Sequence, residues 1–126
     1  MKLSTLFTIN AFVACLYGIT FVFVPEMTLS LYGTTLSPAG VIIARLFGAA
    51  LLGYSVLTWF ARKVADSDAR QAILLALVVS DTVGFIVMLL GQLSGVVNAL
   101  GWSNVAIYLL FALGFGYFQF MKPSNS

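Results

Sequence analysis

Two ionisable side chains lie inside apolar stretches of this 126-residue chain, and they are the residues best suited to chemistry. Asp81 is about ten residues into a hydrophobic segment, near the middle of a bilayer at a rise of about 1.5 Å per residue. A carboxylate there costs at least about 2.5–3.5 kcal/mol unless it is paired, protonated or in contact with water. Two interpretations stay open: a group that handles protons or cations in a polar cavity, and a hydrogen-bonded carboxylate that fixes helix packing.

Arg45 is the second charge at membrane depth, roughly five residues from one end of its own hydrophobic segment. In neighbouring antiparallel helices, Arg45 and Asp81 would differ in depth by about five residues, or roughly 7 Å. We expect an Arg45–Asp81 ion pair, because charges inside membranes normally have partners. The alternatives are an Arg45–Glu26 pair, a network of all three residues, and an Arg45 side chain that snorkels to the headgroups.

Polar residues also gather near the membrane surface on the side of Glu26, and together with Glu26 and Arg45 they are candidates for the lining of an outward-facing pocket. The ordinary alternative is that residues of loops near the interface are polar in any case. Asn10, in the opposite half of the membrane, is a weaker candidate of the same kind. The pocket candidates are Gln92, Ser94, Asn98, Trp102, Ser103 and Asn104.

A stripe of small residues follows one face of the segment that carries Arg45. Gly40, Ala44 and Gly48 are spaced four residues apart, which lets another helix approach closely. We expect this stripe to serve packing inside the protein, with dimerisation as the alternative.

The elements that must position these residues are four membrane-spanning helices. The chain is 61% hydrophobic and only 8% charged, whereas a soluble domain has about 25% charged residues. Each crossing needs roughly 20 apolar residues, so four crossings use most of the chain and leave no room for a soluble domain. The fold class is therefore all-α, one four-helix membrane domain over residues 1–126. We expect spans at about 3–24, 40–60, 71–93 and 102–120, with an amphipathic segment at 25–38.

Basic residues predict the orientation of these spans. Four crossings place both chain ends and the charged loop 61–70 on one side, and the loops on the other side contain no Lys or Arg. This asymmetry predicts that both ends and loop 61–70 are cytoplasmic. It also explains the net charge of +2 without a nucleic-acid partner. The basic residues on the cytoplasmic side are Lys2, Arg62, Lys63, Arg70 and Lys122.

The residue inventory excludes several kinds of chemistry. The chain has no histidine and a single cysteine, so one copy cannot form an internal disulfide, a cysteine redox pair or a histidine-ligated metal site. We expect no cofactor and no metal, and we assign no catalytic residue. One carboxylate and one guanidinium inside the membrane are a small set for an enzyme.

Two resemblances add to this interpretation. The chain resembles small bacterial four-helix membrane proteins of unknown function over nearly its whole length. Residues 44–53 and 98–102 carry this resemblance. This resemblance implies that the protein is located in the bacterial cytoplasmic (inner) membrane. Residues 31–33 followed by 44–48 are similar to the ergosterol-biosynthesis scaffold protein 28 family over about 20 residues. That similarity implies a protein that tethers membrane enzymes and has no catalytic site of its own.

The expected function is a non-catalytic membrane protein: a scaffold, assembly factor or accessory subunit. Its partners would be the lipid bilayer and other membrane proteins or further copies of itself. The alternative is a small oligomeric transporter or channel that uses Asp81 and Arg45.

Overall fold

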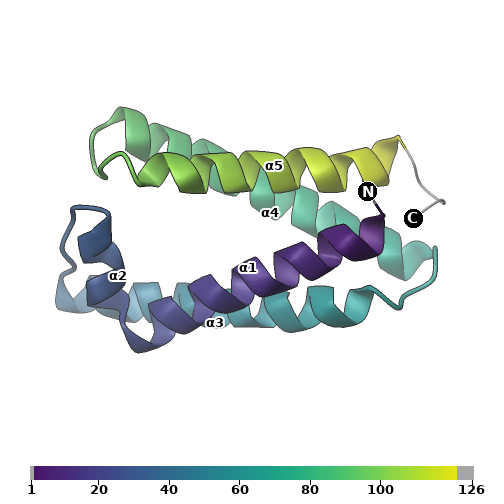
Figure 1. Cartoon of the computed structure of the whole chain (residues 1–126), viewed down its shortest axis with the longest axis horizontal. Coiled ribbons are helices and arrows are strands. Elements are labelled where there is room, and N and C mark those ends of the chain that lie inside the picture. The colour runs from purple at the N-terminus through teal and green to yellow at the C-terminus, as the bar shows by residue number, and fades with distance from the viewer. Residues whose placement is uncertain (1, 122–126) are drawn as a thin grey trace.

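The computed structural model describes residues 2–121, which form five helices and no strand (Figure 1). Four of the helices contain 20 to 26 residues and are apolar enough to cross a membrane. The helices are α1 (Leu3–Phe23), α2 (Pro25–Leu31), α3 (Pro38–Ala61), α4 (Asp68–Leu93) and α5 (Gly101–Phe120). The predicted all-helical fold with four membrane-length helices is confirmed. The predicted spans begin and end within three residues of the observed helices.

The helix boundaries follow from local sequence. Pro25 and Pro38 occupy the first positions of α2 and α3, where a missing backbone N–H is tolerated. Ser37 and Ser67 cap α3 and α4, and each side chain accepts a hydrogen bond from a backbone N–H three residues later. Gly33, with a φ of 78°, makes the turn that follows α2. These signals fix where α2, α3 and α4 begin and where α2 ends.

The first structural unit is the tight pair of α1 and α3, joined by α2, and we call it the first hairpin. A Cβ added to Gly48 would lie 2.9 Å from the carbonyl oxygen of Gly18 on α1, so the two backbones are in direct contact. Ala44 is buried one turn away from Gly48. Gly40, by contrast, faces Leu36 and Ser37 of its own helix start. Two members of the predicted small-residue stripe therefore lie in this interface, and Gly40 does not.

Buried hydrogen bonds continue the same interface toward the other end of α3. The Asn10 side-chain amide donates to the hydroxyl of Thr58 over 3.3 Å, and Thr58 is completely buried. The hydroxyl of Ser55 donates to the backbone carbonyl of Ala11 over 2.7 Å. Small residues and these polar contacts together hold α1 and α3 in register.

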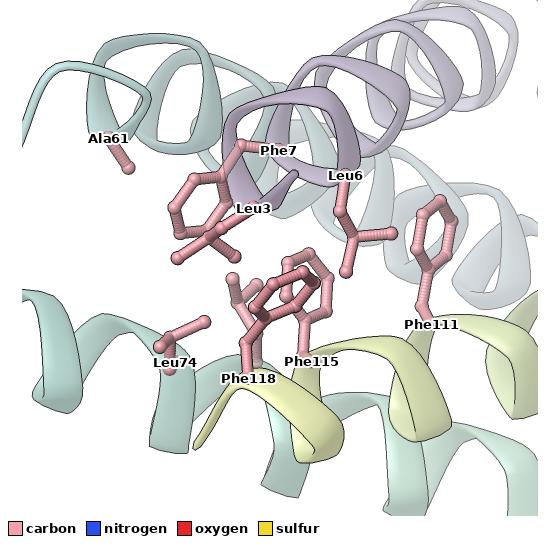
Figure 2. Close-up of a cluster of buried hydrophobic side chains, with 9 residues drawn as sticks. Leu3, Leu6, Phe7, Ala61, Leu74, Phe111, Phe115 and Phe118 are labelled. Atoms are coloured by element: carbon pink, nitrogen blue, oxygen red, sulfur yellow. The ribbon is translucent and has the colours of Figure 1, made fainter. Parts of the chain in front are cut away.

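The second hairpin consists of α4 and α5, and it meets the first hairpin mainly at one end. Figure 1 shows α1 approaching α4 and α5 near the N-terminus, with the two hairpins farther apart toward α2. In Figure 2, side chains of α1 point toward side chains of α4 and α5 in an apolar cluster. The Phe7 and Phe115 ring centroids are 5.6 Å apart. The cluster contains Leu3, Leu6, Phe7, Ala61, Leu74, Leu77, Phe111, Phe115 and Phe118.

The basic residues expected at the cytoplasmic surface gather at this same end. Lys2 precedes α1, Arg62 and Lys63 follow α3, and Arg70 lies in the first turn of α4. Lys122 lies outside the described residues. The side of the membrane that this end faces stays a prediction from the positive-inside rule.

Replacing Gly48 by alanine should separate α1 from α3. The added methyl group would press on the Gly18 backbone and on Val22, so we expect the free energy of unfolding to fall by about 1–3 kcal/mol. Gly116→Ala is the matched control, because an added Cβ there meets nothing within 4 Å. Alanine favours a helix by up to about 1 kcal/mol, so the control should be neutral or stabilising. Unfolding in mild detergent measures both, and equal effects would contradict the close approach.

Candidate functional site

Asp81 is buried on α4 without a partner for its charge. Its side chain is 7% exposed, and its Oδ2 atom has no hydrogen-bond partner among residues 2–121. The one salt bridge in this described part of the chain joins Arg70 to Asp66, over 3.4 Å. A carboxylate at this depth with no compensating group is costly, so its surroundings decide what it does.

Two adjoining cavities meet at Asp81. Their volumes are about 60 Å³ and about 390 Å³, and both take lining residues from α1, α3, α4 and α5. They therefore lie between the two hairpins, and we call the combined space the Asp81 cleft. Residues common to both cavities are Asn10, Ala14, Phe47, Leu51, Asp81 and Tyr108.

Polar groups face the Asp81 cleft from all four long helices. Three of them are tyrosines that the sequence analysis did not consider. Tyrosine is usually enriched at the membrane surface, so tyrosines well inside apolar segments were an available signal. The polar lining residues besides Asp81 are Asn10, Tyr17, Tyr54, Ser80, Asn104 and Tyr108.

Arg45 does not meet Asp81. It is exposed and does not line the cleft, whereas Phe47, two residues later, does. Two residues correspond to about 200° around a helix, so Arg45 points almost directly away from the cleft. No salt bridge in residues 2–121 joins Arg45 to Asp81 or to Glu26, which is exposed in the first turn of α2. The depths were compatible, but the direction of the Arg45 side chain prevents the expected pair.

The predicted outer pocket is instead a set of hydrogen bonds between the hairpins. The Asn98 backbone N–H donates to the carbonyl of Tyr32 over 2.8 Å, and the Asn98 amide donates to the carbonyl of Leu31. The Tyr32 hydroxyl donates to Asn104 over 2.5 Å. We call Tyr32, Asn98 and Asn104 the outer latch, because they tie α2 to the start of α5.

The remaining pocket candidates have separate positions. Gln92 donates to the backbone carbonyl of Asn98 over 3.1 Å, which supports the outer latch. Trp102 is 48% exposed and lines no cavity described above. Asn104 is the one member of the predicted pocket that lines the Asp81 cleft. Gln92, Asn98 and Asn104 therefore take part in or support the outer latch, Asn104 also lines the cleft, and Trp102 lies at the surface.

Tyr32 lies outside the membrane-length helices, and its hydroxyl keeps its proton over a wide pH range. Burial raises the pKa of Tyr32 to about 12, from an ordinary value near 10. The neutral hydroxyl can therefore donate to Asn104 at any physiological pH. Because the folded pKa is raised, this contribution is complete below about pH 10 and is lost as the pH rises toward 12.

The fold and the cleft define a multi-pass membrane protein with a buried carboxylate between two helical hairpins. No group of three or more metal-ligating side chains occurs among the described residues. The chain belongs to the family described as "Domain of unknown function (DUF8292)", which matches residues 1–121. No curated protein and no solved structure matches it. The resemblances to bacterial membrane proteins and to the ergosterol scaffold family stay predictions.

Tyr32→Phe should weaken the outer latch. It removes the hydroxyl that donates to Asn104, and we expect a loss of about 0.5–1.5 kcal/mol in the free energy of unfolding. Tyr117→Phe is the matched control, because Tyr117 is 46% exposed on α5. The difference between the variants should shrink above pH 10, where the Tyr32 contribution is lost. Equal stability of both variants at neutral pH would show that the Tyr32 hydroxyl does not join the hairpins.

Proposed function

We propose that this protein is a non-catalytic scaffold, assembly factor or accessory subunit of the bacterial inner membrane, with both chain ends in the cytoplasm. A transmembrane helix of a partner protein docks on the outer face of α3. The observation that carries this proposal is Arg45, a guanidinium exposed within a membrane-length helix and without an ion pair among residues 2–121.

The surroundings of Arg45 suit a docking helix. Ala49 and Gly53 follow Arg45 at intervals of four residues, and an added Cβ at Gly53 meets nothing within 4 Å. Small residues on an exposed face let a second helix come close in a membrane. Together with Ile42 and Leu46, these exposed residues form what we call the α3 outer face.

Charge chemistry indicates which partner this face selects. An exposed Arg within a span is stabilised by a carboxylate on a neighbouring helix or by lipid phosphates. A partner helix with an Asp or Glu near the same depth would provide that carboxylate and exclude lipid. The proposed partner is therefore a membrane protein whose span carries an acidic residue.

A photoreactive side chain placed at Leu46 should form a protein adduct in native membranes. Leu110 on α5 is the matched control, since these two leucines are 65% and 66% exposed. We expect a discrete adduct from position 46, lost in the Arg45→Gln variant, and only lipid adducts from position 110. Gel mobility and peptide sequencing of the adduct identify the partner and its acidic residue. Lipid adducts alone at position 46 would contradict a docking face.

As a second candidate function, we propose a small oligomeric transporter or channel that uses Asp81 and Arg45. The observation that favours it is the buried carboxylate at the junction of two cavities with several polar walls. Carboxylates in such places commonly belong to proton or ion pathways.

Proteoliposomes with an internal pH-sensitive dye test this second candidate. Under an imposed proton gradient, the wild-type protein should acidify the lumen faster than empty liposomes do. Asp81→Asn should abolish the difference, while Asp68→Asn, at an exposed position in the first turn of α4, should keep it. Absence of wild-type flux would remove transport of protons from consideration.

A further inference from the structure

Aromatic rings surround the carboxylate in the Asp81 cleft. None of the residues that line the two cavities is Lys or Arg, and none besides Asp81 is acidic. Among the lining residues, Asp81 alone can carry a negative charge at neutral pH, and the others are aromatic, aliphatic or neutral polar side chains. The aromatic lining residues are Tyr17, Phe47, Tyr54, Tyr108 and Phe111.

Gly84 places one of these rings next to the carboxylate. It lies three residues after Asp81, on the same side of α4, and a Cβ added to it would overlap the Tyr108 ring. Because Gly84 has no side chain, Tyr108 packs directly against the α4 backbone. The Tyr108 ring and the Asp81 carboxylate are thus brought to one wall of the cleft from two different helices.

The lining chemistry selects one class of ligand. Anions are repelled by an ionised Asp81, and a hard divalent metal ion, which favours several carboxylate ligands, would meet only one in the cleft. An organic ammonium group needs one counter-charge and is attracted to the faces of aromatic rings, most strongly where water is excluded. Asp81 is 7% exposed and its Oδ2 atom has no partner among the described residues, so the counter-charge is available.

We propose that the Asp81 cleft binds a lipophilic organic cation, with its ammonium group between Asp81 and the aromatic rings. The larger cavity, about 390 Å³, lies within the range of small-molecule sites. Val83 and Val87, which line it, are 54% and 61% exposed, so the cleft opens toward the bilayer and an apolar ligand can enter from lipid. This site is separate from the α3 outer face and does not depend on the docking of a partner.

Two probes of the same shape separate charge from apolar fit. Benzyltrimethylammonium carries the cation, and neopentylbenzene replaces its nitrogen by carbon and is neutral. Binding is measured by calorimetry with the full chain in nanodiscs, against empty nanodiscs. We expect the cation to bind at least about tenfold more tightly than its neutral counterpart, because only the cation can form a charge contact with Asp81 away from water.

Variants of the cleft identify the groups that recognise the cation. Asp81→Asn should weaken binding about tenfold or more, while Asp81→Glu and the exposed control Asp68→Asn should keep it. Tyr108→Leu should weaken binding about threefold to tenfold, whereas Tyr108→Phe, which retains an aromatic face, should have little effect. Val83→Trp, at an exposed position, should block the cleft and prevent binding while the charge remains in place.

Circular dichroism and gel filtration establish which variants are folded before binding is compared. Equal affinity for the neutral and cationic probes would overturn the proposal, and so would unchanged binding by a folded Asp81→Asn variant. If that variant does not fold, unchanged binding by Val83→Trp would overturn it. A failed photocrosslink at Leu46 would reject the docking proposal and leave this result unaffected.

Discussion

The backbone contact between Gly18 and Gly48 is the constraint on which the rest of this structure depends. It commits one face of α1 and one face of α3 to each other along most of their lengths. The second hairpin then meets α1 in the Phe7–Phe115 cluster and, at the opposite end, meets α2 through the outer latch. Space is left between these two attachments, and that space is the Asp81 cleft. A cavity in the middle of this small bundle thus follows from how tightly one half of it packs.

The same constraint separates the two intramembrane charges. The face of α3 that carries Ala44 and Gly48 is occupied by α1, and Phe47 lies at the side facing the second hairpin. Arg45 is left on the remaining side, toward lipid. An Arg45–Asp81 ion pair within one chain would require α3 to rotate, which would break the contact with Gly18. The packing of one interface therefore keeps the Arg45 and Asp81 side chains on opposite sides of α3.

Composition and hydropathy were enough to predict the four long helices, because a span must be apolar whatever its neighbours are. The depths of Arg45 and Asp81 followed from residue counting, but a pair also requires matching directions. The direction of the Arg45 side chain was partly predictable from the sequence. Arg45 directly follows Ala44, a member of the small-residue stripe, so it cannot lie on the face of the helix that the stripe occupies. Contacts between Tyr32 and Asn104 join segments 72 residues apart, and no local pattern in one sequence specifies such a contact. The cleft tyrosines were missed because the aromatic ring of a tyrosine within an apolar segment reads as part of the hydrophobic span, although its hydroxyl is polar.

The arrangement of nearly all close contacts within two consecutive hairpins has a consequence for how the protein is made. Residues 3–61 contain everything needed for the α1–α3 interface, so this half can assemble in the bilayer while the remainder is still being synthesised. The second hairpin then forms on its own and docks on the first hairpin through the apolar cluster that contains Phe7 and Phe115. Biogenesis is thereby divided into two local steps and one late joining step. Until that last step, Asp81 lies on a helical surface that the first hairpin has not yet covered.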